Sequence, residues 1–132
     1  MPMKRLIIAA LYLLAPKTCH RLRLERDLAR KLFEPEIDLV PRLCSRNGTA
    51  IDVGAGNGEY AYVMSKYAGT VHAFEPNATT CALLCRGLPA SVKVHEVALS
   101  DRAGSATMRV PRSESLLGTV EATNPLTRRC EN

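Results

Sequence analysis

One segment, DVGAGNGEY at positions 52–60, constrains the fold of this chain more than any other. An apolar run of strand length, residues 50–53, leads into its glycines, and a stretch with helical spacing, residues 59–67, follows them. Glycine lets the backbone turn sharply there and lets a ligand approach the main chain closely. A helix that starts directly after such a loop begins with free backbone amides. The segment therefore predicts a strand, a ligand-binding loop and a helix in succession.

The same alternation of strand and helix continues along the chain. Further apolar runs of strand length lie at residues 70–74, 92–97 and 106–110, and a second helical stretch lies at 78–86. A short helix is expected upstream, over 37–44. Strands that alternate with helices are typical of a parallel sheet with right-handed crossovers. We predict an α/β fold with a Rossmann-like parallel sheet.

The glycine loop does not match two common nucleotide-binding motifs. The dinucleotide fingerprint Gly-x-Gly-x-x-Gly would require a glycine where Glu59 stands, and a phosphate loop ending in Lys-Ser or Lys-Thr is absent. What remains is an acid, Asp52, two residues before the first of three alternating glycines, and this pattern suits a cationic, amine-bearing ligand. Glu75 ends the second predicted strand, where an acid can accept hydrogen bonds from both hydroxyls of a ribose.

Three motifs taken together resemble one enzyme family. They are DVGAGNGEY at 52–60, AFEPN at 73–77 and VALSD at 97–101, preceded by an acidic lead-in, FEPE at 33–36. In this order they are similar to the FkbM-type S-adenosylmethionine-dependent methyltransferases, and the resemblance covers about residues 33–112. Members of the family often carry Asn at the position of Gly56, whereas here the Asn follows as Asn57.

The resemblance implies a role for each matching position. Asp52 and the alternating glycines would hold the methionine end of S-adenosylmethionine, Glu75 would bind the ribose, and Glu96 with Val97 would flank the adenine. The full set of cofactor-binding residues implied is Asp52, Gly54, Ala55, Gly56, Asn57, Gly58, Tyr60, Glu75, Pro76, Glu96 and Val97. The sequence identifies no catalytic base and predicts no metal site.

The second half of the family pattern does not follow the first. Its Leu-Asp-Asp and Ile-Asp-Val-Glu-Gly elements do not occur in this sequence. We therefore expect a class I methyltransferase sheet truncated after its first three parallel strands, with an apolar edge on the first strand left without a neighbour. The expected divisions are a basic helical extension over 1–46, an S-adenosylmethionine-binding half-domain over 47–112 and an irregular tail over 113–132.

Two functions of different classes follow. The resemblance implies methylation of a hydroxyl group on a sugar or natural product, with a small molecule or glycan as the acceptor. The alternative is a non-catalytic remnant or interaction protein that retains the cofactor-binding loop. Simpler roles also stay open at this point: Asp52 could cap loop amides, and Glu75 could be a solvated acid at a strand end. His72 and His95 fit strand positions better than catalysis.

The positive charge of the chain is confined to its N-terminal third. Residues 1–46 carry ten Lys and Arg against five acids, so their net charge of +5 equals that of the whole chain, and the remainder is neutral. Without aromatic residues interleaved in the basic cluster, nucleic acid is not expected as a partner. Residues 18–33 fit a helix with one apolar stripe. The apolar run 6–15 fits a helix packed on the domain or lying on a membrane surface, because no small-residue cleavage site follows it.

The cysteines indicate the redox environment. They are odd in number and scattered, at Cys19, Cys44, Cys81, Cys85 and Cys130. Cys81 and Cys85 have no second pair of metal-ligand spacing to complete a zinc site. Free thiols fit a reducing cytoplasm, which is the expected location, with contact at a membrane surface through residues 1–33.

Overall fold

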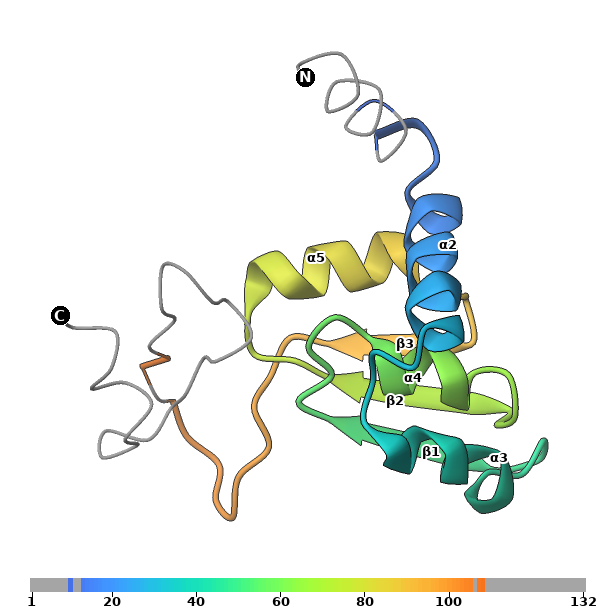
Figure 1. Cartoon of the computed structure of the whole chain (residues 1–132). Coiled ribbons are helices and arrows are strands. Elements are labelled where there is room, and N and C mark those ends of the chain that lie inside the picture. The colour runs from blue at the N-terminus through green and yellow to red at the C-terminus, as the bar shows by residue number, and fades with distance from the viewer. Residues whose placement is uncertain (1–9, 11–12, 106, 109–132) are drawn as a thin grey trace, which may run out of the picture.

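The computed structural model describes residues 10, 13–105 and 107–108. Figure 1 shows the elements in chain order: helix α2 (Pro16–Ala29), 3-10 helix η1 (Pro35–Leu39), helix α3 (Val40–Leu43), strand β1 (Thr49–Val53), helix α4 (Glu59–Met64), strand β2 (Thr70–Phe74), helix α5 (Ala78–Gly87) and strand β3 (Val92–His95). The helix predicted over 37–44 is divided between η1 and α3. The helix predicted over 6–15 and the strand predicted over 106–110 lie mostly outside the described residues, and the tail over 113–132 lies entirely outside them.

The three strands form one parallel sheet in the order β1-β2-β3. Val53, Phe74 and His95 lie side by side in the register, at the carboxyl ends of their strands. Because parallel strands end at the same edge of a sheet, the loops that follow β1 and β2 meet there. The predicted α/β fold is confirmed as an open three-stranded parallel sheet with helices.

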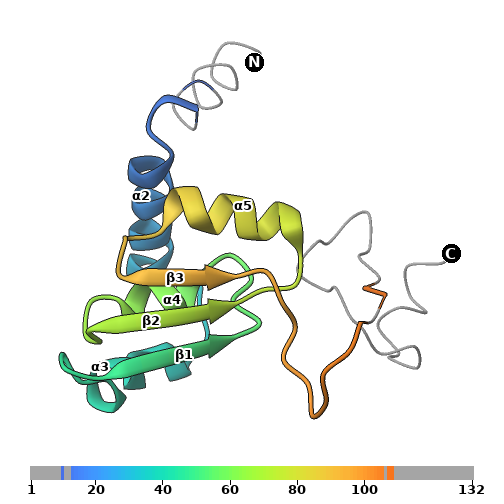
Figure 2. The ribbon, with the colours of Figure 1, turned by 180° about the vertical axis from the view of Figure 1, so that it is seen from behind.

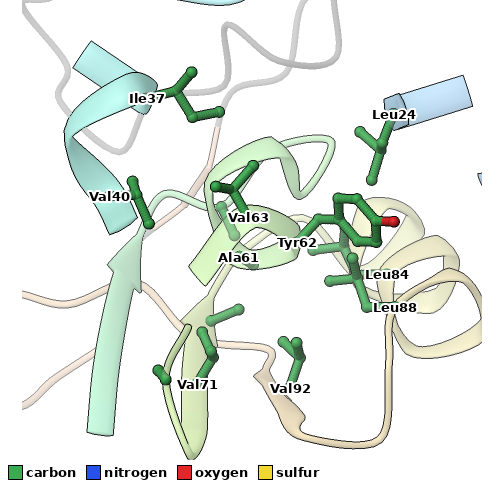
Figure 3. Close-up of a cluster of buried hydrophobic side chains, with 13 residues drawn as sticks. Leu24, Ile37, Val40, Ala61, Tyr62, Val63, Val71, Leu84, Leu88 and Val92 are labelled. Atoms are coloured by element: carbon green, nitrogen blue, oxygen red, sulfur yellow. The ribbon is translucent and has the colours of Figure 1, made fainter. Parts of the chain in front are cut away.

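Helices α4 and α5 cover one face of the sheet and form the core with it (Figures 1 and 3). Every described element except β1 contributes a buried apolar side chain to this core. Val71 of β2, Ala61 of α4 and Leu84 of α5 are at most 1 % exposed. Leu24 of α2 and Val40 of α3 close the cluster from the N-terminal side. Burial of each larger aliphatic side chain stabilises the fold by about 2 kcal/mol.

The opposite face of the sheet, toward the viewer in Figure 2, carries no helix among the described residues. On β1, Ile51 and Val53 are 59 % and 62 % exposed. Next to them Nδ1 of His72 lies 2.8 Å from Nε2 of His95, and the ring of Phe74 stacks on that of His95. Parallel sheets are normally covered on both faces. Within the described part of the chain, β1 is an edge strand, as the sequence leads us to expect, and its apolar side chains are exposed on the open face of the sheet.

Helix α4 and strand β3 end earlier than predicted. The helix predicted over 59–67 ends at Met64, because the amides of Lys66 and Tyr67 bond to carbonyl groups three residues back. The strand predicted over 92–97 ends at His95, because the amide of Val97 donates to the carbonyl of His95 at 3.0 Å and turns the chain away from the sheet.

Helix α2 packs on the domain mainly against α5. Its buried side chains are His20 and Leu24. The helix predicted over 18–33 ends at Ala29, because Lys31 adopts a left-handed φ of 52° that cannot continue the helix. Within the described residues, no helix is both long and apolar enough to cross a membrane.

One hydrogen bond ties α2 to the core helix α4. The hydroxyl of Tyr62 donates to Oε1 of Glu25 at 2.7 Å, and burial, together with this bond, raises the pKa of Tyr62 to about 12. We expect Tyr62→Phe to lower the free energy of unfolding by about 1 kcal/mol, because it removes the bond and keeps the buried ring. Urea unfolding measures the change.

Tyr60→Phe is the matched control for this prediction. The hydroxyl of Tyr60 also donates to a glutamate, Oε2 of Glu34, at 3.1 Å, but this pair lies at the surface. We expect less than about half the loss of the Tyr62 variant, because water replaces an exposed hydrogen bond. Equal losses in the two variants would contradict a specific tie between α2 and α4.

Candidate functional site

The glycine loop after β1 is built from left-handed backbone positions. Gly54, Gly56 and Gly58 have φ values of 77°, 52° and 84°, a region that side-chain-bearing residues rarely adopt. The amides of Gly54 and Ala55 both donate to the carbonyl of Phe74, at 2.9 and 3.0 Å, and so fasten the loop to the end of β2. The alternating glycines therefore have a direct conformational reason, as the sequence predicts.

Glu75 holds the same loop from the next strand. Its Oε2 accepts from the amide of Gly56 at 3.0 Å, and its Oε1 accepts from the amide of Asn77 at 2.8 Å. The side chain is 7 % exposed. It is therefore not a solvated strand-end acid but a structural part of the site. Each carboxylate oxygen retains a lone pair that could accept a further hydrogen bond from a ligand.

Asp52 lies beneath the loop at the end of β1. It is 8 % exposed, and its Oδ2 is buried without a hydrogen-bond partner among the described residues. Burial raises the pKa of Asp52, and the negative charges of Glu59 and Glu75 add to the rise, whereas a backbone hydrogen bond at Ala61 opposes it. A buried carboxylate oxygen without a partner can accept a hydrogen bond from a cationic ligand.

These residues surround a cavity of about 460 Å³ at the carboxyl ends of β1 and β2. It is lined by Leu32, Phe33, Glu34, Asp52, Gly54, Ala55, Gly56, Asn57, Glu59, Tyr60, Glu75, Pro76 and Met108. Eight of the predicted site residues are brought together here. Gly58 lies behind the loop against Leu84, and Glu96 and Val97 are exposed beyond β3 and do not line the cavity.

Five lining residues were not predicted as site residues from the sequence: Leu32, Phe33, Glu34, Glu59 and Met108. The acidic lead-in at 33–36 was the one available signal for part of this set. Glu34 lines the cavity and accepts a hydrogen bond from the hydroxyl of Tyr60. Burial and this bond raise the pKa of Tyr60, so its phenol stays protonated and acts as a donor.

The lining of the cavity is strongly acidic. Glu34, Asp52, Glu59 and Glu75 contribute carboxylates, and no Lys, Arg or His lines it in the described part of the chain. Such a lining attracts positively charged ligands and repels anionic ones.

Within the described part of the chain, no three His, Cys, Asp or Glu side chains are grouped to hold a metal ion. Cys19, Cys44, Cys81 and Cys85 are free thiols.

The buried carboxylate of Asp52 lowers the free energy of unfolding when it is ionised, and this loss can be measured. The folded state raises its pKa above the ordinary value of 3.8, so the protein loses stability as the pH rises from there through the folded-state pKa. We expect Asp52→Asn to escape this loss and to be more stable than the native chain at neutral pH by about 1 kcal/mol. The difference should vanish in acid, where Asp52 is protonated in both states.

Thermal unfolding across the acidic and neutral range tests this, with Asp101→Asn as the control. Asp101 is also an aspartate after a strand region, but its side chain is 79 % exposed. Its substitution should leave the pH dependence of stability unchanged. An Asp52→Asn variant that is less stable than the native chain at neutral pH would show that the carboxylate is compensated in the folded state.

The fold and the cavity together define an α/β protein with an acidic cavity at the carboxyl edge of a parallel sheet. No protein-family model matches the chain, and neither a curated protein nor a solved structure matches it. The resemblance of its motifs to one enzyme family therefore rests on the residues themselves.

Proposed function

We propose that this chain binds S-adenosylmethionine in the acidic cavity and is an FkbM-type methyltransferase that methylates a hydroxyl group of a sugar or natural product. The observation that carries the proposal is the buried Oδ2 of Asp52, which has no partner among the described residues and lies beside the glycine loop. An amine-bearing, positively charged cofactor would supply the missing hydrogen bond and the opposite charge.

The other residues of the cavity fit the remaining parts of the cofactor. Glu75 retains lone pairs for ribose hydroxyls while its two oxygens hold the backbone of Gly56 and Asn77. Gly54 has open space where a Cβ would stand, which leaves room for a ligand close to the main chain. The cavity volume of about 460 Å³ is within the range of small-molecule sites.

An acceptor would have to enter from the part of the cavity that the cofactor leaves free. When bound, S-adenosylmethionine would supply a methyl group on a positively charged sulfur; the acceptor oxygen would bond to the methyl carbon as the carbon–sulfur bond breaks, leaving S-adenosylhomocysteine and releasing the hydroxyl proton. Leu32, Phe33 and Met108 offer apolar contacts there, and the phenol oxygen of Tyr60, which donates its proton to Glu34, can accept a hydrogen bond. We assign no catalytic base to the described residues.

Calorimetric titration of the full chain with S-adenosylhomocysteine tests the proposal. We expect saturable one-to-one binding that Asp52→Asn weakens by about tenfold, because the variant loses a charged hydrogen bond to the ligand amine. Asp101→Asn removes the same charge outside the cavity and should bind like the native chain. If the native chain gives no saturable heat, the chain does not hold this cofactor.

A second candidate function has its own observation. The exposed Ile51 and Val53 on the open face of β1 favour an interaction protein that retains the loop without catalysing methyl transfer. Sedimentation analysis over a range of concentrations distinguishes the two. Association without cofactor binding would favour the interaction protein, and methyl transfer to any hydroxyl acceptor would exclude it.

A further inference from the structure

A second cavity, of about 330 Å³, lies between α2 and α5. Gly56 and Asn57 of the glycine loop line both this cavity and the acidic one, so the loop is a common wall. Helix α2 contributes His20 and Arg23, which lie one turn apart on its inner side, and α5 contributes Arg86 near its end. Figure 1 shows the two helices crossing above the sheet.

The two cavities have opposite charge. The cavity between the helices is lined by two arginines and a histidine, and no Asp or Glu lines it within the described residues. The acidic cavity has four carboxylates and no basic side chain in the same part of the chain. The acidic cavity therefore favours a positively charged group, whereas the cavity between the helices favours a negatively charged one.

Two residues that line the second cavity each have a buried polar atom without a hydrogen-bond partner among the described residues. His20 is 7 % exposed, and its Nε2 is buried with no hydrogen-bond partner among the described residues. Nε of Arg23 is also buried without such a partner. Asp27 forms an ion pair with Arg23, but its Oδ2 lies 4.0 Å from Nε, which is beyond hydrogen-bond distance. Buried polar atoms are normally paired, so two such atoms one helical turn apart on the wall of one cavity indicate a missing ligand.

A glycine in α5 makes room for this histidine. A Cβ on Gly87 would lie 2.6 Å from Cγ of His20, so only glycine lets the ring pack so closely against the helix. The amides at the start of α5 are not available to a ligand, because Oδ1 of Asn77 accepts from those of Thr79 and Thr80 at 3.0 and 3.3 Å. Any anion in the cavity would therefore be held by the side chains rather than by the helix terminus.

We propose that this second cavity binds a phosphate monoester, with its phosphate group at His20 and Arg23. Two guanidinium groups and an imidazole offer donors to the three terminal oxygens of a phosphate. Pro16, Leu83 and Leu84 form an apolar wall for the organic part of the ligand. The proposal does not depend on the function proposed for the acidic cavity.

Binding of a dianion should be coupled to protonation of His20. Burial lowers the pKa of His20, and the charge of Arg23 lowers it further, against a backbone hydrogen bond at Asn57 that raises it. The imidazole is therefore neutral at neutral pH in the free protein, and a bound anion would favour its protonated form. Arg23 of α2 and Arg86 of α5 are the other charged groups that line this cavity.

Calorimetric titration of the full chain with inorganic phosphate at constant ionic strength tests the site. We expect Arg23→Gln to weaken phosphate binding by about tenfold, because it removes a charged donor from the cavity. Arg30→Gln is the matched control, since it removes the same charge from the end of the same helix outside the cavity. Equal weakening in the two variants, or no saturable heat with the native chain, would overturn the proposal.

A pH series with sulfate gives a second readout, because sulfate does not change its own charge near neutral pH. We expect sulfate affinity to rise as the pH falls from about 8 to about 6, and His20→Gln to remove this dependence. A dependence that persists in His20→Gln would overturn the role of this histidine. Circular dichroism confirms that each variant is folded.

The source of the phosphate group is distinguished by two further probes. Tighter binding of butyl phosphate than of inorganic phosphate, without binding of phosphatidic acid vesicles, would support a free phosphate ester. Vesicle binding that Arg23→Gln abolishes and Arg30→Gln preserves would support a lipid headgroup in the same cavity. Vesicle binding that both variants weaken equally would reflect surface charge alone and count against the site.

Discussion

Glu75→Gln is expected to weaken binding of S-adenosylhomocysteine by about a hundredfold. The carboxylate accepts from the amide of Gly56 and from that of Asn77, and one amide loses its acceptor when an oxygen becomes an NH₂ group. The variant therefore lowers affinity twice, by loss of the proposed hydrogen bonds to the ribose and by release of the glycine loop. The measurement is a calorimetric titration below the unfolding temperature of the variant.

Glu96→Gln is the control, because Glu96 follows the next strand of the same sheet but is exposed and does not line the cavity. It removes the same charge and should change affinity by less than about twofold. An unchanged affinity in Glu75→Gln would exclude this acid from the cofactor site. A loss in Glu96→Gln as large as that in Glu75→Gln would mean that the chain beyond β3 closes over the ligand.

Gly58→Ala is expected to be the most destabilising single-methyl change in the loop. Gly58 has a φ of 84°, and a Cβ there would lie 2.8 Å from Cδ2 of Leu84 and 3.2 Å from Cδ1 of Leu88. Left-handed strain and overpacking act together, so we expect the free energy of unfolding to fall by about 3 kcal/mol. Urea unfolding measures this loss.

Gly54→Ala separates the two causes. Gly54 has a similar φ of 77°, but no atom lies within 4 Å of the position of its Cβ. We expect a loss of only about 1 kcal/mol, from backbone strain alone. Equal losses in the two variants would show that Leu84 and Leu88 move aside without cost, and that conformation rather than packing requires the glycine at 58.

The order of elements could be predicted because each has a local cause. The apolar run at 70–74 predicted a strand, whose Val71 and Ala73 are fully buried in the structure, and the glycines predicted the loop. The ends of elements were less predictable. Val97 continues the apolar pattern of β3, yet its amide bonds to His95 instead of to the neighbouring strand. The apolar pattern does not show whether this amide bonds to the neighbouring strand or to the carbonyl of His95, so it does not predict where the strand ends.

The sequence predicted the glycine loop of the candidate site and its two acids, but not the residues that pack around them. Asp52 and Glu75 were identified by their places at strand ends, and the structure adds that Glu75 also supports a loop residue nineteen positions earlier. Glu34 reaches the cavity only through the packing of the N-terminal segment on α4. The burial of His20 depends on the absence of a side chain at Gly87, far away in the sequence, so spacing alone could not distinguish it from the strand histidines.

The order β1-β2-β3 also bears on how the chain folds during synthesis. Each strand pairs with the strand made just before it, so the described sheet can grow in the order in which the ribosome releases it. No strand has to be inserted between two that are already paired. Because the glycine loop is fastened to the carbonyl of Phe74, it can take its final shape once β2 has emerged, before α5 is complete.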